Sequence, residues 1–360
     1  MKKKTKVGLI GVGKRIKVFH YEILEKLNFD ICGCTSKTEK SGQAFESKYN
    51  VKYFNTIESL IKEAKPDFVV CAVPQEELKS VLNKVLELNV PAMIETPIAD
   101  PEIVKLSQKY DVPVCVLEQW PFLPIELFKQ EVFDAEIMSR PFLVKNDGRS
   151  FNYHAMAQLK SYLSPSLPIL AYGVNIGLES PEFIDQGGKV KKEPELWDIG
   201  NVRFQNGTIL THEFSYHCKT APFRPMQTLR SYSDNGTIVT GKSGPLGEDY
   251  DILEFKYLKG QETKVMNVSV ERVHKEQAPT KISDEESGVV WENKFKNLKF
   301  SDQQYACAHL FALMEEVIEN KINKNNLYTC ELAYFDSLLI YAMQHSARNG
   351  STPVNLSGKR

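Results

Sequence analysis

Short apolar runs alternate with amphipathic stretches over the first third of the chain, and this pattern limits the fold more than any other feature. The apolar runs, which contain β-branched residues, are Val7–Ile10, Phe29–Cys34, Phe68–Val73, Ala92–Ile94 and Val112–Leu117. The stretches between them have helical periodicity and are Ile16–Leu27, Glu39–Lys48, Ile57–Glu63, Glu77–Leu88 and Pro101–Tyr110. Apolar strands that alternate with helices form a parallel sheet covered on both faces. We therefore predict a doubly wound α/β domain over residues 1–121.

The alternation stops after about Pro121, and strands become the dominant predicted element. A helix at Pro124–Phe133 precedes a strand at Pro141–Asp147 and a helix at Tyr153–Leu163. Further strands are expected at Ile199–Phe204, Thr208–Phe214, Thr228–Tyr232, Thr237–Thr240, Asp251–Leu258 and Thr263–Val270. The Asn-Gly pair at 206–207, between the first two of these, is a strong hairpin signal. Such a run of strands predicts a second sheet that is mixed or antiparallel.

The rest of the chain contains a predicted loop and two predicted helices. Glu271–Ser287 is charged and contains proline and serine, so we expect a loop there, followed by helices at Asp302–Lys321 and Cys330–Ala347. We predict an α+β domain over residues 122–329, with a large, mostly antiparallel open sheet. The last helix, residues 330–348, is expected to pack back on the first domain.

Composition and charge exclude several classes of protein. Lys+Arg 45 and Asp+Glu 46 leave a net charge of -1, so a nucleic-acid partner is not expected. No apolar run approaches the roughly 18–20 residues of a membrane span, and the apolar stretch behind the first lysines is too short for a signal peptide. The seven cysteines have no CxxC spacing, which indicates a reducing, cytoplasmic setting. Because no HxxxH or HExxH spacing occurs, we expect no metal site.

A glycine-containing turn follows the first predicted strand. Gly11 and Gly13 are separated by one residue, and Lys14, Arg15 and Ile16 open the next helix. Gly11 would permit a tight turn, and Gly13 would let the backbone approach a pyrophosphate at the start of that helix. Ile16 stands where this pattern usually has a third small residue. The position of the turn predicts a dinucleotide site formed by these five residues.

The end of the second strand indicates which dinucleotide is bound. An acidic residue there accepts hydrogen bonds from the ribose of NAD, whereas a basic residue tolerates the 2′-phosphate of NADP. Thr35, Ser36 and Lys37 end this strand without a carboxylate, since Asp30 lies at its beginning. Ser36 and Lys37 are therefore predicted phosphate ligands, with Arg15 as a second cation. NADP is favoured, with NAD as the alternative.

Three later motifs resemble those of the Gfo/Idh/MocA oxidoreductases. Phe68–Pro74 is similar to the strand whose final proline lies beside the nicotinamide ribose, and Met93–Pro97 occupies the place of the family's Glu-Lys-Pro motif. Ser346–Val354 is similar to the closing segment. The resemblance implies a Rossmann domain that binds NAD(P) and an open second sheet that packs against another subunit, giving a homodimer or homotetramer. Its implied cofactor residues are Val73, Pro74, Glu95, Thr96 and Gln119.

The chain departs from the family pattern at three places. Thr96 replaces the motif lysine, and its hydroxyl has a pKa too high for a general acid. Gln75-Glu76-Glu77-Leu78 stands where an Asn/Asp-x-x-His is usual, and Glu118-Gln119-Trp120 replaces Asn-Tyr-Arg. These changes point to an altered chemistry beside the nicotinamide.

The proton donor is sought among the histidines, because imidazole titrates near neutral pH. His154 lies in a stretch that resembles the family's catalytic helix, which implies a role as acid and base. Ser150 stands where that helix would have an acidic partner. Tyr153 and Lys145 are candidates for orienting the substrate oxygen. The alternative is a histidine with only a structural role at the start of a helix.

The resemblance implies hydride transfer between nicotinamide and a C–OH or C=O carbon of a sugar or similar small polar molecule. Two alternatives remain open. Reduction of an imine would depend less on the missing lysine. A regulatory protein that binds NADP without turnover is the second alternative, and Thr96 is the feature that favours it.

Overall fold

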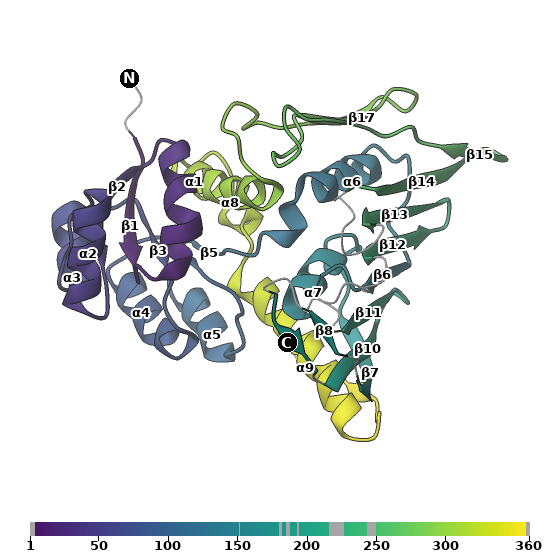
Figure 1. Ribbon diagram of the computed structural model, residues 1–360, viewed down its shortest axis with the longest axis horizontal. Helices are drawn as coiled ribbons and strands as arrows, with labels where there is room; N and C mark the ends of the chain where they lie inside the picture. The colour runs from purple at the N-terminus through teal and green to yellow at the C-terminus, as the bar shows by residue number, and fades with distance from the viewer. Residues whose placement is uncertain are drawn as a thin grey trace. The chain divides into compact units, whose positions relative to one another are not determined.

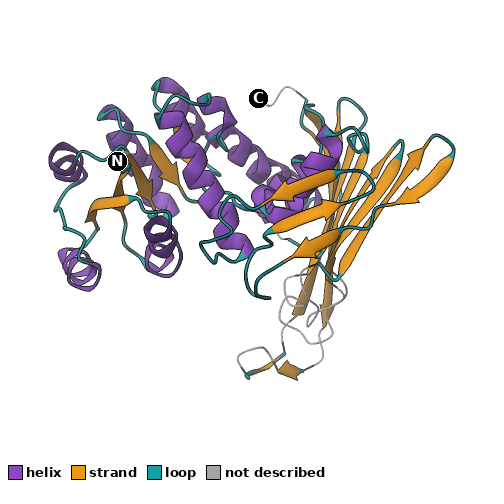
Figure 2. Ribbon diagram, turned by 90° about the horizontal axis from the view of Figure 1, so that it is seen from above, coloured by secondary structure: helices purple, strands orange, loops and turns teal. Residues whose placement is uncertain are grey.

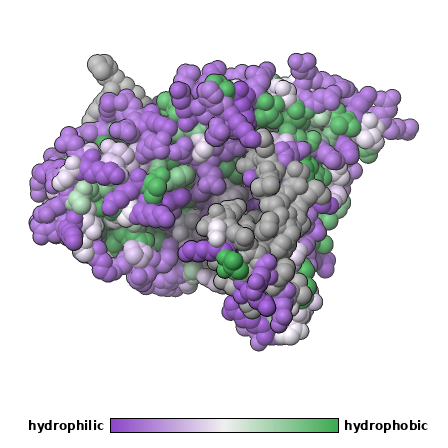
Figure 3. All heavy atoms as spheres, in the orientation of Figure 1, coloured by the Kyte–Doolittle hydropathy of each residue, from purple (hydrophilic) through white to green (hydrophobic). Residues whose placement is uncertain are grey.

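The computed structural model describes residues 4–150, 152–179, 182–184, 188–192, 194–215, 227–242 and 250–357. The chain forms two compact units. The first contains Met1–Leu123, Val273–Ala278 and Lys294–Phe335, and the second contains Pro124–Arg272, Pro279–Asn293 and Asp336–Arg360. Within the described ranges, no helix is both long enough and apolar enough to cross a membrane. Hydrophilic residues cover most of the face shown in Figure 3, with hydrophobic residues in small groups.

A five-stranded parallel sheet forms the centre of the first unit. Its strands, in the spatial order β2-β1-β3-β4-β5, are β2 (Asp30–Thr35), β1 (Lys6–Ile10), β3 (Phe68–Cys71), β4 (Ala92–Ile94) and β5 (Val114–Val116). Every residue of β3, β4 and β5 is buried, because helices lie on both sides of the sheet (Figures 1 and 2). This is the doubly wound parallel fold that the apolar runs predict.

Helical segments connect these strands. They are η1 (Ile16–His20), a π-helical segment, α1 (Tyr21–Lys26), α2 (Glu39–Tyr49), α3 (Ile57–Ser59), η2 (Leu60–Ala64), α4 (Gln75–Glu87), α5 (Pro101–Lys109) and η3 (Trp120–Phe122). The unit also contains α8 (Asp302–Ile318) and η4 (Lys324–Asn326). Helix α2 begins where the side chain of Thr38 accepts a hydrogen bond from the N–H of Ser41, and Asp100 caps α5 in the same way. Helix α4 buries Leu78, Leu82 and Val85 on one face.

A nine-stranded mixed sheet forms the second unit. Its spatial order is β15-β14-β13-β12-β6-β11-β10-β7-β19, in which β6 and β11 are parallel and the other neighbours antiparallel. The strands are β6 (Leu143–Asp147), β7 (Pro168–Glu179), β10 (Pro194–Phe204), β11 (Ile209–Ser215), β12 (Gln227–Ser233), β13 (Gly236–Lys242), β14 (Ile252–Lys259), β15 (Glu262–Val265) and β19 (Val354–Asn355). Two smaller sheets comprise β8 (Phe183–Ile184) with β9 (Val190–Lys191), and β16 (Ser269–Glu271), β17 (Lys281–Asp284) and β18 (Val289–Glu292).

One face of the large sheet is covered by helices. Helix α7 (Asn152–Lys160) packs against β6 and β11 of this sheet, whereas α6 (Pro124–Asp134) packs mainly against β17 and β18 of the small sheet. The strands alternate accordingly, and Val144, Val202, Leu210, Leu229 and Phe255 are fully or almost fully buried on the covered face. The other face carries the intervening side chains, so the expected open sheet is present.

Several boundaries differ from the sequence prediction. Strand β7 was not expected, the predicted loop 271–287 contains β17, and the predicted strand 263–270 divides into β15 and the start of β16. In α9 (Cys330–Arg348), the residues up to Phe335 are grouped with the first unit and those after it with the second. The reason is close contact: a Cβ at Gly173 would lie 2.1 Å from the carbonyl oxygen of Met343. The first unit in turn includes α8, beyond the predicted boundary at residue 121.

Candidate cofactor site

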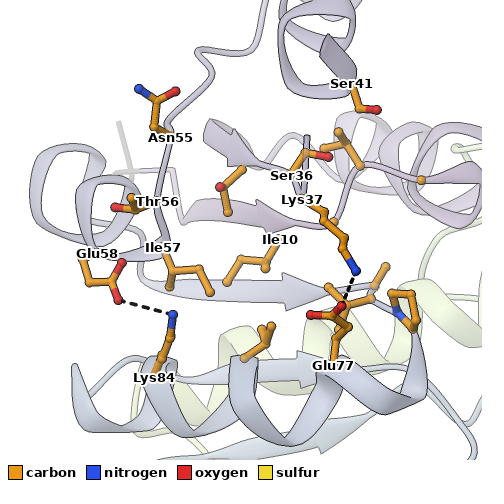
Figure 4. A pocket seen from close by; sticks show the side chains of 18 of the residues that line it. Ile10, Ser36, Lys37, Ser41, Asn55, Thr56, Ile57, Glu58, Glu77 and Lys84 are labelled. Carbon is orange, nitrogen blue, oxygen red and sulfur yellow. Dashed lines mark hydrogen bonds and ion pairs between the residues drawn. The ribbon is translucent and has the colours of Figure 1, made fainter. Parts of the chain in front are cut away.

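A pocket of about 490 Å³ lies at the carboxyl ends of β1, β2 and β3 in the first unit. Gly11 to Gly13 after β1, Ser36 and Lys37 after β2, and Val73 and Pro74 after β3 line it, and α4 closes one side (Figure 4). The strand order changes direction between β1 and β3, and ligands of doubly wound sheets bind at such a switch point. The location of this pocket therefore indicates a ligand site.

The turn after β1 requires glycine at one position and leaves space at another. Gly11 has a φ of 85°, and a Cβ there would lie 2.5 Å from the carbonyl oxygen of Ala72, so a larger residue does not fit. Apart from the adjoining backbone, no described heavy atom lies within 4 Å of the place where a Cβ on Gly13 would be. The absence of a side chain at Gly13 keeps the pocket open. The adjoining helix start offers N–H groups that have no acceptor within the helix, as phosphate binding requires.

Lys37 and Glu77 form an ion pair at the pocket. The Lys37 ammonium lies 2.5 Å from a carboxylate oxygen of Glu77, in the first turn of α4 (Figure 4). The hydrogen bond to Glu77 raises the pKa of Lys37, which is therefore a cation at neutral pH. A second pair, Lys84 with Glu58, lies elsewhere along the pocket at 4.0 Å. The pocket thus presents both cationic and anionic groups to a ligand.

Arg15 and His20 hold Glu95 in place. The Arg15 Nε donates to a carboxylate oxygen of Glu95 at 3.2 Å, and His20 Nε2 contacts the same oxygen. Burial opposes ionisation of Glu95, but the His20 hydrogen bond and the charge of Arg15 hold its pKa below the usual range. His20 Nδ1 lies 3.5 Å from the Sγ of the buried Cys307. Glu95 is therefore a fixed carboxylate at the carboxyl end of β4.

The structure brings only part of the predicted cofactor set into this pocket. Six predicted residues line it: Gly11, Gly13, Ser36, Lys37, Val73 and Pro74. Outside the lining, Ile16 is buried in the core, Lys14 is exposed, and Gln119 is buried beside η3. Arg15, Glu95 and Thr96 are partly exposed but also lie outside this lining. Their assignment to the nicotinamide half of the cofactor remains a prediction.

The sequence reading missed several lining residues. They are Lys17, Ser41, Asn55, Thr56, Ile57, Glu58, Glu77, Val81 and Lys84. Glu77 was noted only as a departure from the family pattern. Its position in the first turn after a strand-ending proline was the available signal, because the first turn of such a helix lies at the carboxyl edge of a parallel sheet.

His154 and Tyr153 lie near the start of α7 in the second unit. Both side chains are partly exposed, and their rings lie 4.3 Å apart between centroids. The helix buries its other side, including Ala155, Met156 and Leu159. Packing therefore fixes the helix while the two predicted catalytic side chains remain accessible from outside the core.

A buried polar network lies beneath this helix. The Lys129 ammonium contacts both carboxylate oxygens of Glu126 at 3.2 Å and the Tyr162 hydroxyl at 2.9 Å. The Gln158 amide donates to Glu126 at 2.9 Å, and its oxygen accepts from the Ser150 hydroxyl at 2.8 Å. Ser150, which replaces the expected acidic partner, thus bonds to Gln158 on α7. The network joins α6, α7 and the segment before α7.

Lys145 forms ion pairs with two carboxylates. It alternates along β6 with the buried Val144 and Asn146, which lie under α7, so its side chain points to the opposite face of the sheet. There its ammonium lies 2.7 Å from Asp147 and 3.5 Å from Glu213. These ion pairs do not support a role for Lys145 beside His154, and that role stays an untested prediction. Among the described residues, no group of three His, Cys, Asp or Glu could hold a metal ion.

The fold and the pocket are those of a dinucleotide-binding domain. Residues 5–111 match the sequence profile of the Gfo/Idh/MocA oxidoreductase family, NAD-binding Rossmann fold. Residues 5–111 are therefore similar to the cofactor domain of that family, which implies an NAD(P) nucleotide cofactor.

Three relatives indicate how far the similarity extends. An uncharacterized protein of Saccharomyces cerevisiae is 21% identical over 137 residues, which cover 35% of this chain and 39% of that protein. An oxidoreductase from Agrobacterium radiobacter, solved with NAD+, L-tartaric acid and magnesium, has a TM-score of 0.66, 14% identity and coverage of 99% and 100%. An aldose-aldose oxidoreductase from Caulobacter crescentus, solved with glycerol, has a TM-score of 0.64, 13% identity and coverage of 98% and 100%. At these identities, the two solved structures show the fold alone.

Proposed function

We propose that this protein is an NADP(H)-dependent oxidoreductase that transfers a hydride between nicotinamide and a C–OH or C=O carbon of a sugar-like substrate. One observation carries the proposal: the glycine turn and the Lys37 cation line the same pocket at the switch point of a family Rossmann sheet. The similar structure from Caulobacter crescentus is an aldose-aldose oxidoreductase, which supports a sugar-like substrate. Loss of NADPH absorbance across a panel of sugars and keto-sugars tests the activity.

The pocket fits the phosphates and ribose of such a cofactor. The open space at Gly13 would take a pyrophosphate, and Ser36 and Lys37 would contact a 2′-phosphate. When bound, the nicotinamide would supply or accept the hydride. The chain itself must then hold the substrate and move a proton.

Replacing Lys37 with aspartate tests the choice of cofactor. We expect NADPH to bind the wild type more tightly than NADH, because a cation favours the 2′-phosphate. In Lys37→Asp, a carboxylate would face that phosphate, so NADPH affinity should fall about tenfold or more while NADH affinity is kept or gained. Titration by calorimetry gives both dissociation constants. Equal affinities in the wild type would refute the NADP assignment.

We assign the proton transfer to His154, with Tyr153 beside it to orient the substrate oxygen. The partial exposure of both side chains on a firmly packed helix supports this assignment. Thr96 then serves as a neutral hydrogen-bonding group where the family has lysine. The same residue supports the second candidate, an NADP-binding protein without turnover. Binding of NADPH with no consumption on any substrate of the panel, imines included, would favour that candidate.

A homodimer is expected from the face of the large sheet that no described helix covers. Leu170, Tyr172 and Ile176 of β7 and Ile209 of β11 share this face and are 37–40% exposed. Covering such an apolar row by a second copy would bury more than about 1,000 Å² in total. We expect light scattering at micromolar concentration to give a dimer or tetramer of the 41.0 kDa chain. A monomer would contradict this assembly, whereas Ile176→Lys should weaken it.

A further inference from the structure

The Lys37–Glu77 pair joins two walls of the pocket that would both lie beside a bound nucleotide. Lys37 follows β2, where the ribose of a dinucleotide is recognised, whereas Glu77 comes from the first turn of α4. Figure 4 shows the two side chains pointing toward each other. The end of β2 has no carboxylate of its own, and the carboxylate that pairs with Lys37 is that of Glu77.

We propose that Glu77 sets the balance between NADPH and NADH, as a carboxylate supplied by α4 instead of by β2. For NADPH, Glu77 competes with the 2′-phosphate for the Lys37 ammonium. For NADH, the same carboxylate accepts hydrogen bonds from the ribose hydroxyls. The inference rests on the proposed function in that it takes this pocket as the cofactor site.

The charges make this competition substantial. A 2′-phosphate carries close to two negative charges. A phosphate bound to Lys37 would also lie near Glu77, because the Glu77 carboxylate is 2.5 Å from the Lys37 ammonium. Repulsion between the phosphate and the Glu77 carboxylate at such separations should lower the affinity for NADPH several-fold, even with strong solvent screening. The phosphate must therefore displace Glu77 or share the lysine with it.

A purely structural role explains the pair poorly. The two side chains are 78% and 38% exposed, and ion pairs between groups this exposed contribute little to stability. Both groups can also rotate away without opening the core, because neither is buried. The pair is therefore free to rearrange when a ligand enters.

The test is Glu77→Gln, which keeps the size of the side chain and removes its charge. We expect NADPH to bind about 3- to 10-fold more tightly and NADH to bind more weakly, so that the ratio of the two dissociation constants shifts about tenfold or more toward NADPH. Fluorescence titration of each nucleotide measures this ratio, and raised salt should reduce the gain for NADPH.

The matched control is Glu102→Gln. Glu102 also lies in the first turn of a helix, is 46% exposed and pairs with a lysine, Lys105, at 2.7 Å, but it lies outside the pocket lining. The ratio should stay within about twofold of wild type in this variant. Lys37→Gln and the double variant complete a cycle: without Lys37, removing the Glu77 charge should improve NADPH binding less.

The outcomes separate this inference from the proposed function. If the wild type binds neither nucleotide, the proposed function fails. If the wild type binds NADPH but Glu77→Gln leaves the ratio unchanged, or changes both affinities equally, the role of Glu77 is refuted and the cofactor site stands. If the ratio of the two dissociation constants shifts in Glu77→Gln but not in Glu102→Gln, the proposed role of Glu77 is supported.

Discussion

His154→Ala is expected to lower kcat by about 10²–10⁴ while leaving the dissociation constant of NADPH nearly unchanged. The loss follows from removing the group that exchanges a proton with the substrate oxygen during hydride transfer. Cofactor affinity should persist because the described pocket is formed by residues of the first unit, whereas α7 belongs to the second. Steady-state kinetics on a substrate found by the panel, together with NADPH titration, measures both quantities.

Thr96→Ala is the matched comparison for this result. As a neutral hydrogen-bonding group, Thr96 should be worth only about 1 kcal/mol in kcat/KM. A loss beyond about 10³ in Thr96→Ala, with cofactor binding intact, would contradict that role, since one neutral hydrogen bond contributes far less. Thr96→Lys restores the residue of the family motif and should keep or raise activity on an alcohol substrate.

A pH profile distinguishes catalysis by His154 from support of the fold. If His154 exchanges the proton, the plot of kcat/KM against pH for the wild type should contain a limb that is missing in the alanine variant. If His154→Ala keeps the kcat of the wild type, His154 has only a structural role at the start of α7. Loss of activity together with a lowered melting temperature would indicate the same role.

The first unit could be predicted from the sequence because its signals are local. Each strand is a short apolar run, and the turn at Gly11 is required by a backbone conformation that glycine adopts readily. The location of Lys37 in the pocket also followed, since the carboxyl ends of parallel strands meet at one edge. In these cases, residues close in sequence decide the structure.

Features that depend on distant residues could not be predicted. Strand β7 contains glycine at 173, which weakens its strand signal, yet that glycine is needed because Met343 of α9 passes within contact distance. The pairing of Glu77 with Lys37 joins positions forty residues apart. His20 likewise reaches Glu95 across the sheet edge. Only the folded chain brings these groups together.

The polar network under α7 is the least expected feature of the second unit. Glu126 and Lys129 are 1% and 2% exposed, and their burial could not be read from a charged pair on an amphipathic helix. Burial lowers the pKa of Lys129, and the neighbouring Glu126 carboxylate opposes that shift. Through Gln158 and Ser150, the network also anchors the start of the helix that carries His154.

Removing the charge of Glu126 should therefore destabilise the protein strongly. In Glu126→Gln, the Lys129 ammonium would be left buried without a counter-charge, which typically costs about 3–5 kcal/mol of unfolding free energy. Urea titration followed by far-ultraviolet circular dichroism measures the change. Glu131→Gln, at an exposed carboxylate on the same helix, should change the free energy by no more than about 0.5 kcal/mol.

The double variant Glu126→Gln/Lys129→Met shows whether the cost comes from the uncompensated charge. With the ammonium also removed, the new amide can still bond to the Tyr162 hydroxyl and to Gln158, so at least about 2 kcal/mol of the loss should be recovered. A double variant as unstable as Glu126→Gln would instead mean that packing and hydrogen bonds, and not charge, hold this region. In that case the position of His154 would depend on the hydrogen bonds of Gln158 and Ser150. A Gln158→Leu variant should then lower kcat, while its urea midpoint should fall less than that of Glu126→Gln.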